Sequence, residues 1–276
     1  MKNIRKPAVA GKFYPDSRED IVYLLEEVVI KEKSKTHSAI SGSIIGGVVP
    51  HAGYVYCAYE AVHFFEVLKI QNVMIDTIFI LHPDHYGYGK NVNLDGNEMW
   101  ETPMGRVEID TDFYPYLPFP ISKDAHSVEH SGEVILPYLQ FFLEYEFKIV
   151  PISFSMQNIE NAKKVAQSIY DANVKLGKEI LLIASSDFSH YVNPAKGKKL
   201  DQLVINEIIK LKSEGVYDMI MANNISICGY CPIISLIEYC KLIEEKIKVK
   251  ILRKGHSGEI FPSEEVVDYV SILFYY

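Results

Sequence analysis

Hydrophobic residues make up 48% of the 276-residue chain, which is enough for the core of one large α/β domain or two small ones. The formal net charge of −8 argues against non-specific nucleic-acid binding, because that requires a basic surface. The apolar runs are far too short to span a membrane, and no signal-peptide core follows the basic start. We therefore expect a cytoplasmic protein that binds neither nucleic acid nor membrane.

The chain begins with an arm and a helix. Residues 6–15 have no clear period, which predicts an extended arm. Ser17, with Asp20 three residues later, resembles a helix cap, and apolar residues at helical spacing follow it. Residues 31–42 are polar and predict a surface connection.

Three apolar runs end in histidine, within residues 44–51, 76–89 and 179–190. Short apolar runs followed by turn residues are typical of buried strands. Ligands of α/β proteins bind outside the carboxyl ends of the strands, so we expect the three ends to meet in one cleft. The polar side chains at these ends are His51, His82, Asp84, His85, Asp187 and His190.

The remaining elements alternate between helices and strands. Helices are predicted at residues 56–70, 129–145, 159–175, 201–213 and 232–245, and strands at 147–154, 246–252 and 266–274. Residues 91–94, 98–101 and 106–109 predict short antiparallel strands or a flap over the sheet edge. Pro137 must kink its helix or lie in the first turn. We expect a three-layer α/β/α fold with a central mixed sheet, as a single domain over residues 1–276.

Each polar residue at a strand end has a structural interpretation as well as a functional one. A lone histidine such as His51 or His85 is more often a hydrogen-bonded structural residue than a ligand. His82 points the other way along the strand period, which fits a supporting or packing role. Asp187 and His190, three residues apart, could form a carboxylate–imidazole pair that fixes one tautomer, or Asp187 could simply cap a helix.

Two further groups of residues are candidates for a ligand-binding or catalytic role. His130 and Glu133 are spaced i, i+3, so they would share one helix face, either in a site or at a solvated helix start. Cys228 and Cys231 form a single C-x-x-C, which is weak evidence for a zinc site and comes too late in the chain for a thioredoxin-like motif. The spacing favours Cys228 as a ligand or reactive thiolate, and Cys231 and Cys240 as buried packing residues.

Six ordered motifs resemble the Memo family, which is also called protein B of the AmmeMemoRadiSam system. They are KPAVAGKFYP, VVPHAGYVYC, ILHPDHYGYG, EHSGEVILPYL, IASSDFSHY and ICGYCPI, and they cover nearly the whole chain. The resemblance implies a fold similar to the class III extradiol ring-cleaving dioxygenases. Those enzymes hold non-haem iron(II) with two histidines and a carboxylate.

At the matching positions, the resemblance implies metal ligands at His51 and His85. The cysteine of the family's cleft falls on Cys228, where the dioxygenases have their glutamate. Asp187 and His190 match the remaining pair of the cleft, and His190 stands where the dioxygenases have an acid/base histidine.

The second histidine motif departs from the family pattern. The family commonly has Gly-Pro-Asn/Ser-His, whereas this chain has His82, a proline, Asp84 and His85, and the extra imidazole and carboxylate could alter metal preference or loop geometry. The EHS-x-E motif falls on Glu129, His130, Ser131 and Glu133. We expect His82, Asp84, His130 and Glu133 to support the site or contact substrate.

The expected cofactor is one divalent metal ion, with iron(II) first and zinc or copper as alternatives, because thiolate is a softer ligand than carboxylate. The expected function is metal-dependent, oxygen-activating redox chemistry on an unidentified substrate. Two alternatives are a scaffold that binds a ligand or peptide in a non-catalytic cleft, and a metal-dependent hydrolase. The expected partners are a small molecule or peptide, and other proteins of the AmmeMemoRadiSam system.

Overall fold

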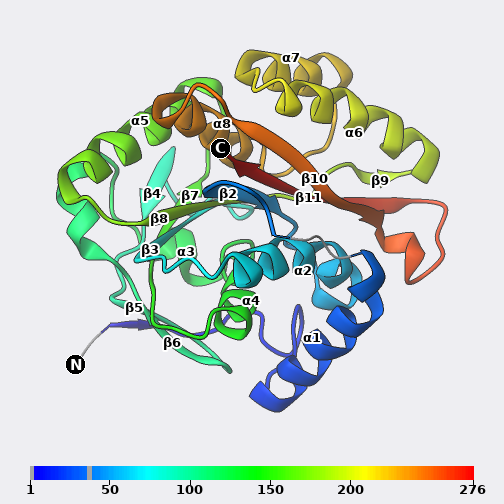
Figure 1. Cartoon of the computed structure of the whole chain (residues 1–276), viewed down its shortest axis with the longest axis horizontal. Coiled ribbons are helices and arrows are strands. Elements are labelled where there is room, and N and C mark those ends of the chain that lie inside the picture. Colours follow the sequence, from blue (N-terminus) through cyan, green and yellow to red (C-terminus); the bar gives the residue numbers. More distant parts are fainter. Residues whose placement is uncertain (1–2, 36–38) are drawn as a thin grey trace.

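The computed structural model describes residues 3–35 and 39–276 (Figure 1), so residues 36–38 of the predicted polar connection lie outside the described part. The strands are β1 (Ile4–Arg5), β2 (Ile44–Val49), β3 (Thr77–Pro83), β4 (Val92–Leu94), β5 (Met99–Thr102), β6 (Gly105–Glu108), β7 (Lys148–Phe154), β8 (Ile180–Ser185), β9 (His190–Val192), β10 (Lys248–His256) and β11 (Val266–Tyr275). The α-helices are α1 (Arg18–Glu32), α2 (Tyr54–Gln71), α3 (Asp124–Ser127), α4 (Ile135–Phe142), α5 (Ile159–Leu176), α6 (Pro194–Ile209), α7 (Ser213–Asn223) and α8 (Tyr230–Ile243). Short 3-10 helices are η1 (Lys33–Lys35), η2 (Thr111–Tyr116) and η3 (Ser257–Glu259).

A mixed sheet with the strand order β10-β11-β2-β8-β3-β7-β4 forms the centre of the molecule, and β9 pairs with β11 beside it. Strands β2, β8, β3 and β7 run parallel to one another. Strand β11 runs antiparallel to β2 and to β10, and β4 runs antiparallel to β7. The parallel strands therefore end at one common edge. The prediction of an α/β protein with a central mixed sheet is confirmed.

Helices flank the sheet on both faces, with α5 and α8 on one side and α2 and α4 on the other (Figure 1). In β3, Phe79 and Leu81 join the apolar cluster of the first side, and Ile78 and Ile80 join that of the second. This alternation follows from the two-residue period of a strand. Each such side chain contributes roughly 1.5–3 kcal/mol by its burial, so the alternating faces hold both helix layers in place.

The flap predicted from three short strands is divided between two sheets. Strand β4 pairs antiparallel with β7 at the edge of the central sheet. Strands β5 and β6 instead form a separate three-stranded sheet with β1 from the N-terminal arm. The arm is thus held by pairing with a segment almost 100 residues away, which local sequence patterns do not reveal.

Two predicted helices have different bounds from those expected. The helix predicted at 129–145 is confined to α4, and a turn over residues 131–134 precedes it; Pro137 lies in the first turn of α4, as one of the two predicted options required. The helix predicted at 201–213 begins earlier, at Pro194, because the Asn193 side chain caps it. It ends before Leu211, whose φ of 55° is left-handed, and α7 follows as a separate helix.

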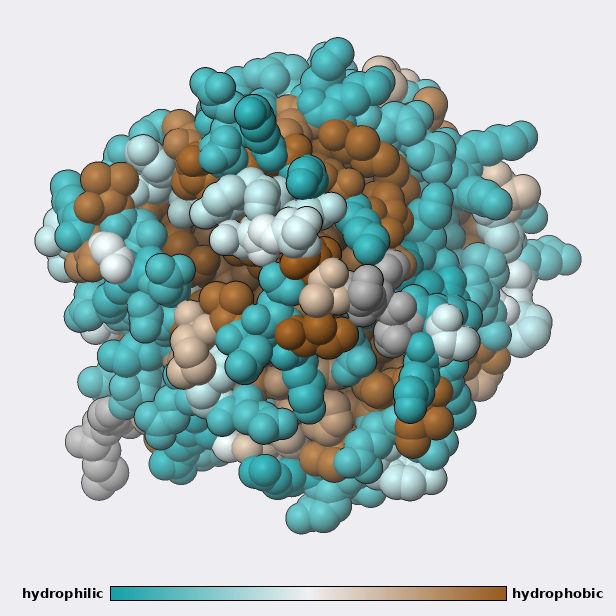
Figure 2. All heavy atoms as spheres, in the orientation of Figure 1, coloured by the Kyte–Doolittle hydropathy of each residue, from teal (hydrophilic) through white to brown (hydrophobic). Residues whose placement is uncertain are grey.

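Hydrophilic side chains cover most of the face shown in Figure 2, and smaller groups of hydrophobic side chains lie between them. Most large apolar side chains are instead buried in the two clusters beside the sheet. Within the described ranges, the structure contains no helix with the length and apolar character that a membrane span requires.

Candidate metal centre

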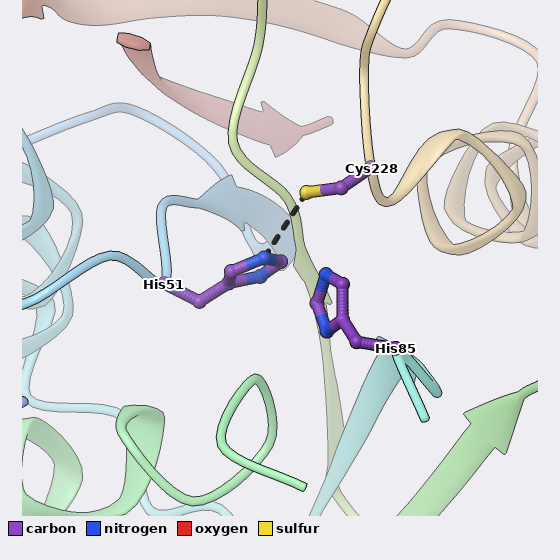
Figure 3. A group of neighbouring side chains, drawn as sticks. All are labelled: His51, His85 and Cys228. Carbon is purple, nitrogen blue, oxygen red and sulfur yellow. Dashed lines mark hydrogen bonds between the residues drawn. The ribbon is translucent and has the colours of Figure 1, made fainter. Parts of the chain in front are cut away.

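His51, His85 and Cys228 lie together at the common edge of the parallel strands (Figure 3). One possible ligand atom from each of the three lies within 4.8 Å of the others. His51 follows β2, His85 follows β3, and Cys228 lies in the loop before α8. The His51 Nε2 and Cys228 Sγ atoms are 3.0 Å apart. Segments separated by as many as 177 residues thus supply one nitrogen-and-sulfur cluster.

Two hydrogen bonds of the Ser185 hydroxyl group fix the tautomer of His51. The Ser185 hydroxyl donates to the carbonyl oxygen of Ser131 at 2.6 Å. Its oxygen can therefore only accept from His51 Nδ1, which lies 2.8 Å away, so Nδ1 carries the proton. The lone pair of Nε2 consequently faces Cys228. Burial and the neighbouring imidazoles lower the pKa of His51 well below its usual value, which keeps the ring neutral.

Glu129 orients the second imidazole. Its Oε1 lies 2.9 Å from His85 Nδ1, and its Oε2 accepts from the His85 backbone N–H at 2.6 Å. Burial alone would raise the pKa of Glu129, but the hydrogen bond from His85 and the surrounding imidazoles outweigh it and lower the pKa. The carboxylate therefore holds the proton of His85 on Nδ1 and leaves Nε2 available as a ligand. A carboxylate behind a ligand histidine is a common feature of metal sites.

Asp187 connects the cysteine to the first histidine. Its backbone N–H donates to Cys228 Sγ at 3.2 Å, and its Oδ1 accepts from the His51 backbone N–H at 2.8 Å. Burial raises the pKa of Asp187 to about 6. Burial, together with the Asp187 charge, also raises the pKa of the Cys228 thiol well above its usual value. Without a cation the thiol therefore keeps its proton, whereas a bound cation favours the thiolate.

The hydrogen-bonded pair expected between Asp187 and His190 is not formed. His190 begins β9, and its backbone N–H and Nδ1 lie 2.8 Å and 2.7 Å from the Ser226 hydroxyl and carbonyl oxygens. Asp187 is turned towards His51 instead, and it caps no helix. The Ser226 carbonyl fixes the proton of His190 on Nδ1, which leaves Nε2 free. His190 still lies close enough to His51 to lower the pKa of that residue.

His130 lies beside both ligand histidines. Its ring stacks on His85 with centroids 4.7 Å apart and meets the His51 ring edge-on at 5.5 Å. His130 Nδ1 is 3.3 Å from Glu129 Oε1, so His85, Glu129 and His130 form a second group whose ligand atoms are close together. Burial lowers the pKa of His130 to about 4, so this ring is neutral near pH 7.

His82 and Asp84 stabilise the loops around the centre. Asp84 accepts hydrogen bonds from backbone N–H groups within residues 86–89, which fixes the loop after His85. The buried His82 contacts the Ser131 hydroxyl at 3.1 Å and His126 Nδ1 at 3.2 Å. Gly132 packs against the ring of His82, where an added Cβ would lie 2.8 Å from its nearest carbon. The two residues that depart from the family pattern are therefore engaged in local packing.

Glu133 holds the N-terminal arm. Its carboxylate pairs with Arg5 Nη1 at 2.6 Å and accepts from the Tyr14 hydroxyl at 2.6 Å and from backbone N–H groups of residues 8–9. The prediction that His130 and Glu133 share one helix face is wrong, because both precede α4 and contact different partners. In turn, Arg5 donates to the carbonyl oxygen of Glu129, so the arm braces the turn that orients His85.

The donor set fits a transition-metal ion. Two imidazoles and one thiolate suit zinc, copper or iron, and three protein ligands leave a further coordination position open. Both imidazoles are already in the tautomer that leaves Nε2 available.

The family model for Memo-like protein matches residues 5–273 of the chain. A MEMO1 family protein of Methanosarcina mazei is 34% identical, with 98% of each chain covered, and one of Archaeoglobus fulgidus is 36% identical over 98% of this chain and 99% of its own. The MEMO1 family protein MJ0403 of Methanocaldococcus jannaschii is 35% identical over 99% of both chains.

A solved structure is similar in fold alone. The uncharacterized protein JW3007 from Escherichia coli K12 superposes with a TM-score of 0.50 at 12% identity. The match covers 77% of this chain and 91% of that protein. At this identity, the similarity supports the α/β architecture and says nothing about activity.

Proposed function

Since the chain belongs to the Memo-like protein family, we propose that His51, His85 and Cys228 bind one divalent metal ion and that the protein is a metal-dependent oxidoreductase. The main support is the convergence of the three ligand atoms within 4.8 Å. The two imidazoles are oriented by hydrogen bonds to Ser185 and Glu129, so no rearrangement of tautomers is needed before an ion binds. The substrate is an unidentified small molecule.

Iron(II) is the favoured metal, with zinc and copper as the alternatives. The family resembles the class III extradiol dioxygenases in fold, and here Cys228 replaces the carboxylate of their iron site. A thiolate is soft and oxidisable, which suits redox chemistry but also accepts zinc or copper. When bound, the metal supplies Lewis-acid or redox chemistry at its open position.

The residues of the chain itself divide into ligands, positioning groups and one proton carrier. His190 Nε2 is free because the Ser226 carbonyl oxygen lies 2.7 Å from Nδ1, so this nitrogen can accept or donate a proton at the substrate. Asp187 positions His51 and Cys228 rather than His190. Glu129 keeps the His85 tautomer constant while the metal binds.

A binding module without catalysis is the second candidate function. Two pairs of exposed aromatic side chains favour it: Tyr56 with Phe261, with centroids 5.5 Å apart, and Tyr86 with Tyr88, 5.8 Å apart. Tyr56 and Tyr86 lie within a few residues of His51 and His85 in the sequence, so both pairs suit contact with a peptide or small molecule near the metal centre. In that case ligand affinity would not depend on Cys228.

The first experiment measures metal content and affinity in anaerobically purified protein. The Cys228→Ser variant should lose metal affinity by an order of magnitude or more, whereas the buried Cys240→Ser control should match the parent. Bound metal should also protect Cys228 from alkylation, as read by mass spectrometry of its peptide. Equal alkylation rates with and without metal, together with unchanged affinity in Cys228→Ser, would remove Cys228 from the site.

The second experiment separates redox catalysis from simple metal binding. Iron(II)-loaded parent protein is given ascorbate as reductant, and its oxygen uptake is compared with that of free iron(II) and of Cys228→Ser. Uptake that exceeds both controls would support the oxidoreductase proposal. If metal binds but oxygen uptake equals that of free iron, the redox proposal fails and the metal site remains.

A further inference from the structure

The loop that leads into α8, residues 226–231, contributes to the candidate metal centre in two ways. Cys228 Sγ faces His51 Nε2 across 3.0 Å (Figure 3). The Ser226 hydroxyl accepts from the His190 backbone N–H at 2.8 Å, and the Ser226 carbonyl oxygen lies 2.7 Å from His190 Nδ1. One short loop therefore positions both the sulfur ligand and the imidazole to which we assign proton transfer.

This loop is pressed against the end of β8 at Gly229. A Cβ added at this glycine would lie 2.3 Å from the Ser185 carbonyl oxygen, so only glycine allows so close an approach. Gly229 is also the N-cap residue of α8, and it has no side chain that could accept from the first N–H groups of the helix. The close packing against β8 therefore leaves α8 without a side-chain cap of its own.

Gln157, in the loop between β7 and α5, supplies this cap from outside the helix. Its Oε1 accepts from the backbone N–H of Cys231, in the first turn of α8, at 3.0 Å. Its Nε2 donates to the carbonyl oxygen of Cys228. An amide can make both contacts because it carries an acceptor and a donor side by side. One side chain thus holds both ends of the segment from Cys228 to Cys231.

Two further hydrogen bonds join the same two loops without using the Gln157 side chain. The Tyr230 hydroxyl donates to the Gln157 carbonyl oxygen at 2.8 Å, and Cys231 Sγ donates to the Asn158 carbonyl oxygen at 3.0 Å. These contacts remain when the Gln157 side chain is changed, so they keep the loops together. The amide of Gln157 can therefore be tested separately from the general packing of the loops.

We propose that Gln157 is a positioning residue that holds Cys228 where its sulfur can bind the metal. The inference rests on the metal binding proposed for His51, His85 and Cys228. Functional sites tolerate ligand displacements of only about 0.5 Å. The Gln157 amide fixes the main chain that bears the thiol, and the Asp187 backbone N–H fixes the sulfur itself. The sulfur is thus in place before an ion arrives.

Cobalt(II) titration of the full-length chain tests this inference. A thiolate is a soft, oxidisable ligand, so its bond to cobalt(II) gives a charge-transfer absorption in the near ultraviolet that imidazole ligands do not give. Gln157→Leu loses both contacts of the amide, whereas Gln157→Glu keeps the acceptor for Cys231 and loses the donor to Cys228. Both variants should bind cobalt(II) at least about tenfold more weakly. Both should also show less charge-transfer absorption per bound ion, which a loss of stability alone would not cause.

Tyr230→Phe is the matched control, because it removes one hydrogen bond between the same loops and leaves the Gln157 side chain intact. It should bind cobalt(II) as the parent does, with the same charge-transfer intensity. Thermal unfolding measures the structural cost of each variant. Parental affinity and absorption in both Gln157 variants would overturn the inference. An equal loss in Tyr230→Phe would also overturn it, because general loosening of the loops would then be the cause.

Two further results separate this inference from the function on which it rests. If the parent itself shows no charge-transfer absorption with cobalt(II), Cys228 is not a ligand and the proposed metal site fails first. If the parent shows it and the Gln157 variants match the parent, only the inference fails. In metal-free protein, iodoacetamide should alkylate Cys228 about fivefold faster in Gln157→Leu, since one hydrogen bond to its main chain is lost. Equal alkylation rates would overturn the role of the amide in placing Cys228 before metal binds.

Discussion

The backbone N–H of Asp187 donates a hydrogen bond to Cys228 Sγ across 3.2 Å. The carboxylate of the same residue accepts from the His51 backbone N–H at 2.8 Å. One residue thus fixes the cysteine through its main chain and the histidine loop through its side chain. Asp187 is only 4% exposed, so this arrangement is shielded from competing water.

We predict that Asp187→Ala lowers metal affinity by roughly 10- to 100-fold, the range typical for groups that orient metal ligands. The loss arises because the backbone N–H group of His51 loses its acceptor. Chelator competition measures the affinity, and His190→Gln is the comparison, because His190 is bonded to Ser226 instead. If His190→Gln weakened metal binding as much as Asp187→Ala, the assigned positioning role of Asp187 would be wrong.

Glu129→Gln should lower metal affinity by a similar factor, roughly 10- to 100-fold. Glu129 accepts from the ring and backbone of His85 and from the Ser131 backbone N–H. In the glutamine, one carboxylate oxygen is replaced by an NH₂ group, which cannot accept a hydrogen bond. One of these N–H donors would therefore face another donor, so the His85 ring must turn or lose its partner. Glu101→Gln at the surface controls for the change of charge. Unchanged affinity in Glu129→Gln would show that the His85 orientation is set by other contacts.

Sequence patterns predicted most of the central sheet because its strands are short apolar runs with clear ends. They did not predict that β4 joins this sheet while β5 and β6 pair with β1. Which strands pair depends on contacts between residues far apart in the sequence, and local patterns do not contain that information. The helix start expected near Glu129 failed for a related reason. A turn over residues 131–134 precedes the helix instead, and the carboxylates of Glu133 and Glu129 bind the arm and His85.

The cluster of His51, His85 and Cys228 was predictable from the motifs and the resemblance that they carry. The groups that orient these ligands were less accessible to sequence reasoning. Ser185 lies 134 residues from His51, and Ser226 lies 36 residues from His190. The one local signal is that Ser185 is the last residue of β8, directly before the loop that contains Asp187. The short spacing between Asp187 and His190 was misleading, because Asp187 bonds the His51 backbone and His190 bonds Ser226 instead.

We predict that Glu133→Gln destabilises the protein by about 3–5 kcal/mol, because it leaves the buried Arg5 charge without its partner. The side chains of Arg5 and Glu133 are 2% and 0% exposed. The next residue of the arm offers a matched control. Lys6 pairs with Glu101 at 65% and 22% exposure, so Glu101→Gln should cost at most about 1 kcal/mol. Urea unfolding measures both; similar losses in the two variants would contradict the buried pairing.

Glu60 provides a pH-dependent prediction away from the metal centre. Its side chain is buried on α2, and Arg253 Nη2, 3.8 Å away, is shared with Glu259 at 3.2 Å. Burial outweighs this weak compensation and raises the pKa of Glu60 from 4.5 to about 8. Between these two values the folded protein holds a proton that the unfolded chain has released. Stability therefore falls as the pH rises through this window, and Glu60 adds no further change above it.

Glu60→Gln removes this ionisation, so its stability relative to the parent should increase from pH 5 to pH 8. The expected change in the difference of unfolding free energies is roughly 3–5 kcal/mol, since one pKa unit corresponds to about 1.4 kcal/mol. Urea unfolding of both proteins at several pH values measures it, and the exposed Glu26→Gln on α1 corrects for net charge. A difference between Glu60→Gln and the parent that stays constant across this range would mean that Glu60 is ionised in the folded protein. The Arg253 guanidinium would then compensate Glu60 despite its contact with Glu259.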